Sequence, residues 1–119
     1  MIIPMSKFLL ASEANLSEHW SKKKKRHDLQ KSTIRINFSL NFSEPPALPC
    51  LITMTRIAPR ELDYDNFVYS LKWIKDTIAD SILHGFSPGR ADGNVKMKWE
   101  YLQEKGKVKE YALKIKIQW

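Results

Sequence analysis

The sequence RELDYDNFVYSLKWIKD, residues 60–76, marks the point where an extended chain becomes helical. Beyond its two aspartates, apolar residues recur with helical spacing, which indicates one buried stripe. We predict a helix from Asp65 or Asn66 to about His84, with Gly85 as its C-terminal stop. The expected stripe consists of Phe67, Leu71, Ile74, Ile78 and Ile82.

Alternation of apolar and polar residues predicts strands on both sides of this helix, because every second side chain of a strand shares a face. The clearest alternation is STIRINFSLNF, residues 32–42, and a run rich in β-branched residues follows at 50–58. Two further strands are expected at 95–102 and 109–119. Gly106 suits a hairpin turn between these last two.

A weaker helix is predicted at residues 17–31, where polar residues dominate. Strands that are separated by one long helix are typical of an α+β domain. We therefore predict a single domain over residues 1–119. In this domain a mostly antiparallel sheet of about four strands packs against one long helix, with the weaker N-terminal helix beside it.

The composition places the chain among ordinary globular proteins, with 43% hydrophobic and 28% charged residues. The single cysteine, Cys50, cannot form an internal disulfide, which favours a reducing compartment. No apolar run approaches the roughly 18 to 20 residues that span a bilayer. The apolar run near the N-terminus is too short for a signal peptide. We expect a cytoplasmic protein with no membrane association.

Positive charge is concentrated in the first half of the chain. The net charge is +7, and residues 1–60 carry ten lysines and arginines against four acids. Much of the excess lies in SKKKKRH, residues 21–27. Such a run indicates either a polyanionic partner or a solvated segment. Its neighbours His19 and Trp20 favour nucleic acid, because aromatic rings stack on bases.

The two aspartates of the opening stretch admit two interpretations. If the chain is still extended there, Asp63 and Asp65 project to the same side, and two close carboxylates are natural ligands of a divalent cation. Magnesium prefers such oxygen ligands, and Asp92 in the loop after the helix is a third candidate. The alternative is structural: either of the pair can cap the helix, and Asp92 can be a turn residue.

The order of these features resembles the RusA-type Holliday junction resolvases, small endonucleases common in prophages. That family carries an arginine-bearing strand end, an R-x-x-D-x-D-N segment that opens a helix, a loop aspartate and a W-x-Y strand. The matching stretches are Arg60–Asn66, Asp92–Gly93 and Lys98–Gly106, and the polar segment from Asn15 is similar to the family's N-terminal region. The likeness spans about residues 15–119.

The resemblance implies a homodimeric, Mg²⁺-dependent endodeoxyribonuclease that resolves four-way DNA junctions by paired nicks, in DNA recombination and repair. Mn²⁺ is the natural substitute for the metal. Asp63 and Asp65 match the paired aspartates of the motif, Asp92 matches the loop aspartate, and Asn66 matches the asparagine. These three aspartates are the implied metal ligands and catalytic residues.

Two positions depart from the family pattern. Tyr69 stands where the family has a lysine, and Lys72, one helical turn later, is the candidate that replaces it near the developing negative charge. Ala91 stands where many relatives have a second loop acid. These departures keep open the alternative of a catalytically weak or inactive relative that binds branched DNA without cleaving it.

Binding to DNA is expected to depend on shape and charge, since no segment resembles a helix that reads bases. Basic side chains would contact backbone phosphates and offset the repulsion from the acidic site. The residues predicted to make these contacts are Lys22, Lys23, Lys24, Lys25, Arg26, Arg56 and Arg60.

Overall fold

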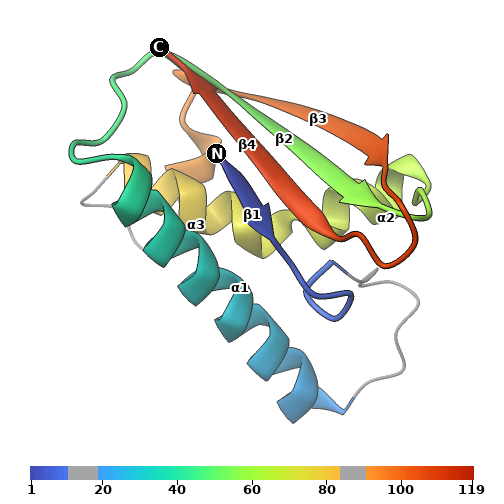
Figure 1. Cartoon of the computed structure of the whole chain (residues 1–119). Helices are drawn as coiled ribbons and strands as arrows, with labels where there is room; N and C mark the ends of the chain where they lie inside the picture. The colour runs from blue at the N-terminus through green and yellow to red at the C-terminus, as the bar shows by residue number, and fades with distance from the viewer. Residues whose placement is uncertain (11–18, 84–90) are drawn as a thin grey trace.

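The computed structural model describes residues 1–10, 19–83 and 91–119, and of Asp92 only the backbone. Its elements are β1 (Ile2–Pro4), α1 (Trp20–Asn41), β2 (Cys50–Ala58), α2 (Tyr64–Ser70), α3 (Lys72–Ile82), the short 3-10 helix η1 (Ala91–Gly93), β3 (Met97–Lys105) and β4 (Ala112–Gln118). The four strands form one sheet, and α1 and α3 lie together over one of its faces (Figure 1). The predicted α+β class is confirmed.

The sheet is mixed, with the strand order β1-β4-β2-β3. β4 runs antiparallel to both β1 and β2, whereas β2 and β3 are parallel and pair from Cys50↔Met97 to Ala58↔Lys105. The hairpin predicted at Gly106 is therefore wrong, because β2 lies between β3 and β4. Gly106 instead donates its backbone N–H to the carbonyl of Ala58 at 2.8 Å, and the chain then crosses the end of β2.

The strand predicted at residues 32–42 is also wrong, because this segment is the second half of α1. Thr33 and Asn37 bond their side chains back to the carbonyls of Leu29 and Thr33, four residues earlier, as helical geometry allows. The buried positions recur at near-helical intervals: Arg26, His27, Gln30, Ile34 and Phe38. Residues 20–31 of the weaker predicted helix and residues 32–41 thus form one helix of 22 residues, whereas positions 17 and 18 of the prediction lie outside the described residues.

The helix predicted from Asp65 or Asn66 to His84 is divided in two at Leu71. Leu71 has φ −98° and ψ 3°, outside helical values, and separates α2 from α3. The apolar stripe is nevertheless continuous, since Phe67, Leu71 and Ile74 are all at most 1% exposed. His84 and the predicted stop at Gly85 lie outside the described residues.

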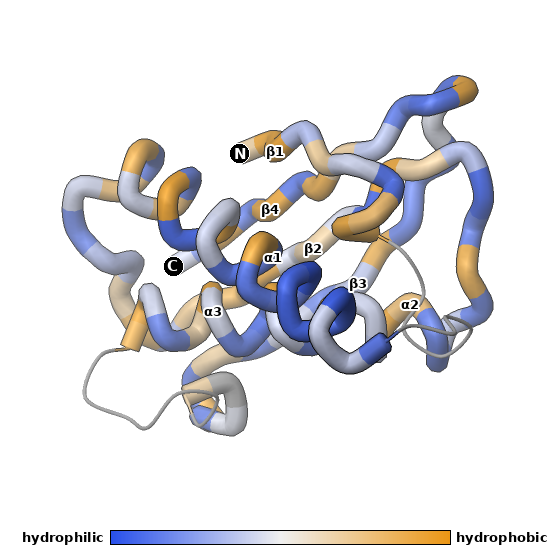
Figure 2. The backbone as a smooth tube through the Cα atoms, turned by 90° about the horizontal axis from the view of Figure 1, so that it is seen from below, coloured by the Kyte–Doolittle hydropathy of each residue, from blue (hydrophilic) through white to orange (hydrophobic). Residues whose placement is uncertain are grey.

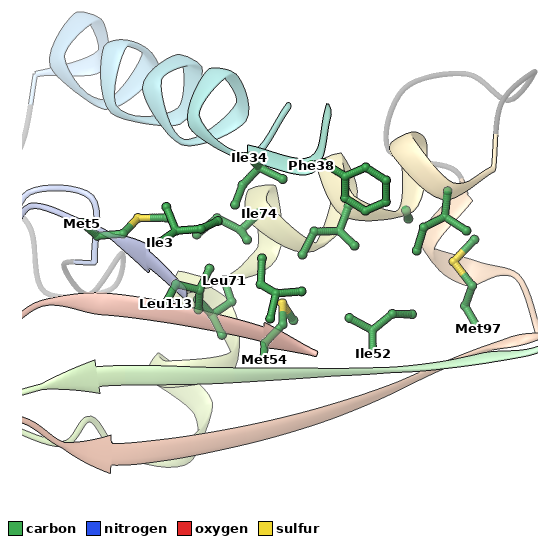
Figure 3. Close-up of a cluster of buried hydrophobic side chains, with 14 of the residues drawn as sticks. Ile3, Met5, Ile34, Phe38, Ile52, Met54, Leu71, Ile74, Met97 and Leu113 are labelled. Atoms are coloured by element: carbon green, nitrogen blue, oxygen red, sulfur yellow. The ribbon is translucent and has the colours of Figure 1, made fainter. Parts of the chain in front are cut away.

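The core lies between the sheet and the two long helices (Figure 2). Figure 3 shows Ile34 and Phe38 of α1 pointing toward Ile74 of α3 and toward the inner face of the sheet. Ile52 and Met54 of the central strand β2 are completely buried there. No helix among the described residues is long and apolar enough to cross a membrane.

Candidate functional site

Asp63 caps α2. Its backbone is extended (φ −61°, ψ 155°), and its Oδ2 accepts a weak hydrogen bond from the backbone N–H of Asn66 at 3.4 Å. The side-chain amide of Asn66 donates to the other oxygen, Oδ1, at 2.5 Å. The capping interpretation is therefore confirmed for Asp63. This role does not compete with metal binding, because the side chain is exposed and the carboxylate keeps further lone pairs.

Asp65 lies in the first turn of α2 and is exposed to solvent. The condition under which both aspartates would project from an extended chain is not met, because Asp65 is already helical and Asp63 is the cap. Among the residues that the structure describes, nothing donates a hydrogen bond or ion pair to Asp65. The Asp65 carboxylate is thus free to take a hard cation, which prefers oxygen ligands and retains several waters.

Two side chains fix the turn that carries these aspartates. Gln103 of β3 accepts from the backbone N–H of Leu62 at 2.9 Å and donates to its carbonyl at 2.8 Å. Arg56 of β2 donates through Nη1 to the carbonyl of Arg60 at 2.8 Å. Arg56 and Gln103 are direct partners in the parallel strand pair, so both reach the turn from the same end of the sheet.

Sequence reasoning did not identify Gln103, although a signal is present. The inward positions of β3 are Met97, Trp99, Tyr101 and Gln103. A polar residue at the end of an otherwise apolar inward series indicates a specific hydrogen-bonding role, because polar groups are buried only with partners.

Replacing Gln103 with leucine is expected to destabilise the protein by about 1–2 kcal/mol, because the half-buried backbone of Leu62 loses both partners. Urea denaturation of Gln103→Leu and of Gln118→Leu, an exposed glutamine on β4, measures this difference. Equal stability of the two variants would show that the Gln103 clamp contributes nothing.

The third predicted ligand, Asp92, comes from the opposite end of the sheet. Asn94 donates its N–H to Ala91 O, and Met97 donates to Asn94 O, which keeps η1 at the start of β3. The turn before Asp63 is tied to Gln103 of β3. Gln103 lies six residues beyond Met97 along this strand, which corresponds to about 20 Å at 3.3 Å per residue. Figure 1 shows the orange segment that leads into β3 far from α2. Within a single chain, the backbone of Asp92 therefore lies far from Asp63 and Asp65.

No three histidines, cysteines or acids gather into a metal-binding cluster in the described parts of the chain. The aspartate pair is the feature that fits a divalent ion, since Mg²⁺ often takes one or two protein carboxylates and completes its shell with water. Ala91 is fully buried in the core beside α3, so its side chain serves packing.

Tyr69 and Lys72 are the two positions considered for the predicted lysine, and both side chains are exposed. Tyr69 is 44% exposed and meets Trp73 edge-on, and Trp73 in turn stacks on His27 of α1 at 3.7 Å between ring centroids. Lys72 is exposed at the first residue of α3 and forms a loose ion pair of 3.6 Å with Asp76. The Lys72 ammonium is therefore held near α3 only weakly.

The predicted phosphate-binding residues of α1 divide into exposed and buried members. Lys22, Lys24 and Lys25 are exposed, and Lys23 is half-buried. Figure 2 shows in blue that hydrophilic residues follow one another along the first turns of α1. Arg26 is fully buried, so its guanidinium does not belong to this exposed basic surface.

Lys24 pairs with Asp28 one turn away at 2.9 Å, and this hydrogen bond lowers the pKa of the Asp28 carboxyl. Such exposed pairs contribute little to stability. The first turns of α1 nevertheless keep an excess of positive charge, which suits a polyanion.

Arg56 lies near the end of β2, and Arg60 lies in the turn that leads from β2 to the aspartates. Arg60 is exposed, whereas Arg56 is 6% exposed and donates through Nη2 to Leu10 O at 3.2 Å. Burial lowers the pKa of the Arg56 guanidinium, although an arginine stays protonated at neutral pH. A cavity of about 460 Å³ opens beside them. Arg56 lines this cavity, so the cavity is where a phosphate would meet its guanidinium.

Comparison with known proteins gives no match: no family model fits the sequence, and no curated protein and no solved structure is significantly similar to it. A function for this chain is therefore inferred from the order of its motifs and from the geometry of the aspartate turn.

Proposed function

We propose that this protein is a magnesium-dependent endodeoxyribonuclease that resolves four-way DNA junctions by paired nicks during recombination and repair. The observation that carries the proposal is the exposed pair Asp63 and Asp65 on a turn that Arg56 and Gln103 tie to the sheet. The resemblance to RusA-type resolvases supports it, since the D-x-D-N motif falls where a strand gives way to a helix.

Phosphodiester hydrolysis needs an activated water and compensation of the negative charge that develops at phosphorus. When bound, Mg²⁺ would supply both, held by oxygens of Asp63 and Asp65. Asn66 keeps the Asp63 carboxylate oriented before the ion arrives, because it donates to both of its oxygens. Lys72 would offset the developing charge, and its loose pairing with Asp76 leaves it able to do so.

The exposed lysines of α1 would provide the sequence-independent part of DNA binding. Lys22, Lys24 and Lys25 can neutralise backbone phosphates and release counterions, so binding should weaken steeply with added salt. Contacts of this kind position a duplex without reading its bases, as a junction-selective enzyme requires.

The position of η1 leads us to propose a homodimer in which each metal site is shared. If Asp92 is a ligand, it has to come from a second copy, because its own backbone lies at the other end of β3 from Asp63 and Asp65. A two-fold symmetric pair would then form two such sites. Two equivalent sites would also account for the symmetric nicking of two strands that the proposed activity requires.

A complementation experiment tests the shared site and the nuclease activity together. Asp65→Asn and Asp92→Asn should each be inactive, and chains refolded as a mixture should regain about a quarter of the wild-type sites, all of them in mixed dimers. On a supercoiled plasmid with an extruded cruciform, the mixture is expected to give nicked circles where the wild type gives linear product.

The matched control is a mixture of Asp63→Asn and Asp65→Asn, in which every site is damaged and no activity should return. Mass spectrometry of the intact dimers verifies that mixed dimers form. Their presence without recovered nicking, or full activity of Asp92→Asn alone, would contradict a shared site.

A second candidate function is binding to branched DNA without cleavage. Two observations favour it: a tyrosine occupies the place of the motif's lysine, and Ala91 is buried where relatives carry an acid. Tight, salt-sensitive binding of a four-way junction, with no nicking in either Mg²⁺ or Mn²⁺, would establish this function instead.

A further inference from the structure

A buried positive charge without a carboxylate partner lies at the base of the cavity beside β2. Arg56 is 6% exposed, and neither ion pair nor carboxylate contact to it occurs within the described residues. Its Nη groups donate to two backbone carbonyls, while its Nε is buried with no hydrogen-bond acceptor. A buried charge and an unused donor are each costly, so this arrangement favours an anion.

The lining of the cavity is consistent with that anion. Three cationic side chains, Lys7, Arg56 and Arg60, line it together with the half-buried Tyr111, and no acid lines it among the residues that the structure describes. They come from three separate parts of the chain: the segment after β1, the end of β2, and the approach to β4. Only folding brings them together, which is why the sequence alone indicated just the two arginines.

The size and the remaining walls indicate what the anion is attached to. The cavity holds about 460 Å³, whereas one water molecule occupies about 30 Å³, so a phosphate group leaves most of the space unfilled. The rest of the lining is apolar, formed by Leu10, Ala58, Pro59 and Leu62. An apolar wall beside a cationic cavity floor suits a phosphate group that is attached to a sugar.

We propose that this cavity binds the phosphate group of a nucleotide unit, with Arg56 at its base and Lys7, Arg60 and Tyr111 around it. Guanidinium and ammonium groups form their strongest hydrogen bonds with such oxyanions, and the tyrosine hydroxyl can donate another. The cavity adjoins the turn that carries the aspartates, but Asp63 and Asp65 are not among its lining residues, so phosphate binding does not require the proposed metal ligands. If the proposed nuclease activity is correct, the cavity would hold a phosphate of the bound strand near the cleavage site.

The test is a titration of the ¹⁵N-labelled full chain, observed through the Nε–H resonance of Arg56 at low ionic strength. The probes are inorganic phosphate, an unphosphorylated dinucleotide with one internal diester, and the same dinucleotide with a 5′-phosphate. We expect saturable shifts of this resonance with both dinucleotides, because the Arg56 guanidinium lies against the cavity that the phosphate would occupy. Preference for the 5′-phosphate would identify a strand end as the ligand, and equal binding would identify an internal diester.

Variants at the cavity rim avoid the risk of unfolding that accompanies substitution of Arg56. Lys7→Gln and Arg60→Gln, both at exposed residues, should each weaken dinucleotide binding about five- to tenfold. Lys98→Gln, an exposed lysine on β3 outside the cavity, is the control and should leave it unchanged.

Three outcomes would overturn the proposal: no shift of the Arg56 resonance with any probe, binding of inorganic phosphate as tight as that of the dinucleotides, or equal losses in Lys7→Gln and Lys98→Gln. The Asp65→Asn variant should retain dinucleotide binding in full. Failure of the nuclease proposal and failure of the phosphate site are therefore distinguishable.

Discussion

Replacement of Asp65 by asparagine should lower the rate of Mg²⁺-dependent junction cleavage by about 100-fold or more, since even residues that only support metal ligands typically cost 10- to 100-fold. The fold should not suffer, because Asp65 is exposed and has no partner within the described residues. The helix loses the favourable interaction of its dipole with a negative charge in its first turn, which contributes about 0.3–1 kcal/mol to stability.

Cleavage of a labelled four-way junction, together with thermal unfolding, separates the catalytic role from the structural one. Asp63→Asn should lose activity similarly, while Asp63→Ala should in addition lose about 1 kcal/mol of stability with the helix cap. Glu100→Gln, an exposed acid on β3, is the matched control and should cleave normally. Magnesium-dependent cleavage that persists in Asp65→Asn would remove the aspartate pair from the mechanism.

Substitution of Phe38 by alanine should destabilise the protein by about 3–5 kcal/mol, whereas Leu40→Ala should change the stability by no more than about 0.5 kcal/mol. Phe38 is 6% exposed and packs against Phe42 and the core, whereas Leu40 is 79% exposed. The two residues are two apart, so a helix places them on different faces while a strand would place them on the same face.

Urea denaturation of the two variants measures this difference. A pair of less disruptive substitutions, Ile34→Val and Ile36→Val, serves the same purpose if Phe38→Ala is too unstable to study. Ile34→Val should cost about 1 kcal/mol because Ile34 is fully buried, and Ile36→Val should have little effect because Ile36 is 60% exposed. Similar losses at positions 38 and 40, or at 34 and 36, would contradict the helix.

The segment 32–42 shows how an alternating pattern can mislead. Ile34 and Phe38 satisfy the period of a strand and also the i, i+4 spacing of a helix, so the pattern alone does not distinguish the two. The outcome depends on the residues before it: Gln30, His27 and Arg26 extend the helical stripe, and their polar character hid it. Tertiary packing against α3 overrides the β-propensity of the isoleucines.

Local sequence patterns likewise did not indicate which strands pair with each other. The strand at Cys50–Ala58 was predicted with correct bounds, and β3 and β4 were found within a few residues. Their alternation defines which side chains face inward but not which strand lies beside which. The insertion of β2 between β3 and β4 follows from contacts between residues that are far apart in the sequence.

At the candidate site, the sequence by itself indicated the residue types: two aspartates at a helix start, an arginine at a strand end, and an excess of positive charge ahead of them. These are local properties, since capping depends on neighbours along the chain. Only the tertiary structure decided that Gln103 and Arg56 hold this turn, that Arg56 lies under a cavity with Lys7, and that η1 is remote from Asp63. The physical reason is that such relations depend on sheet order and long-range packing, which no short stretch of sequence encodes.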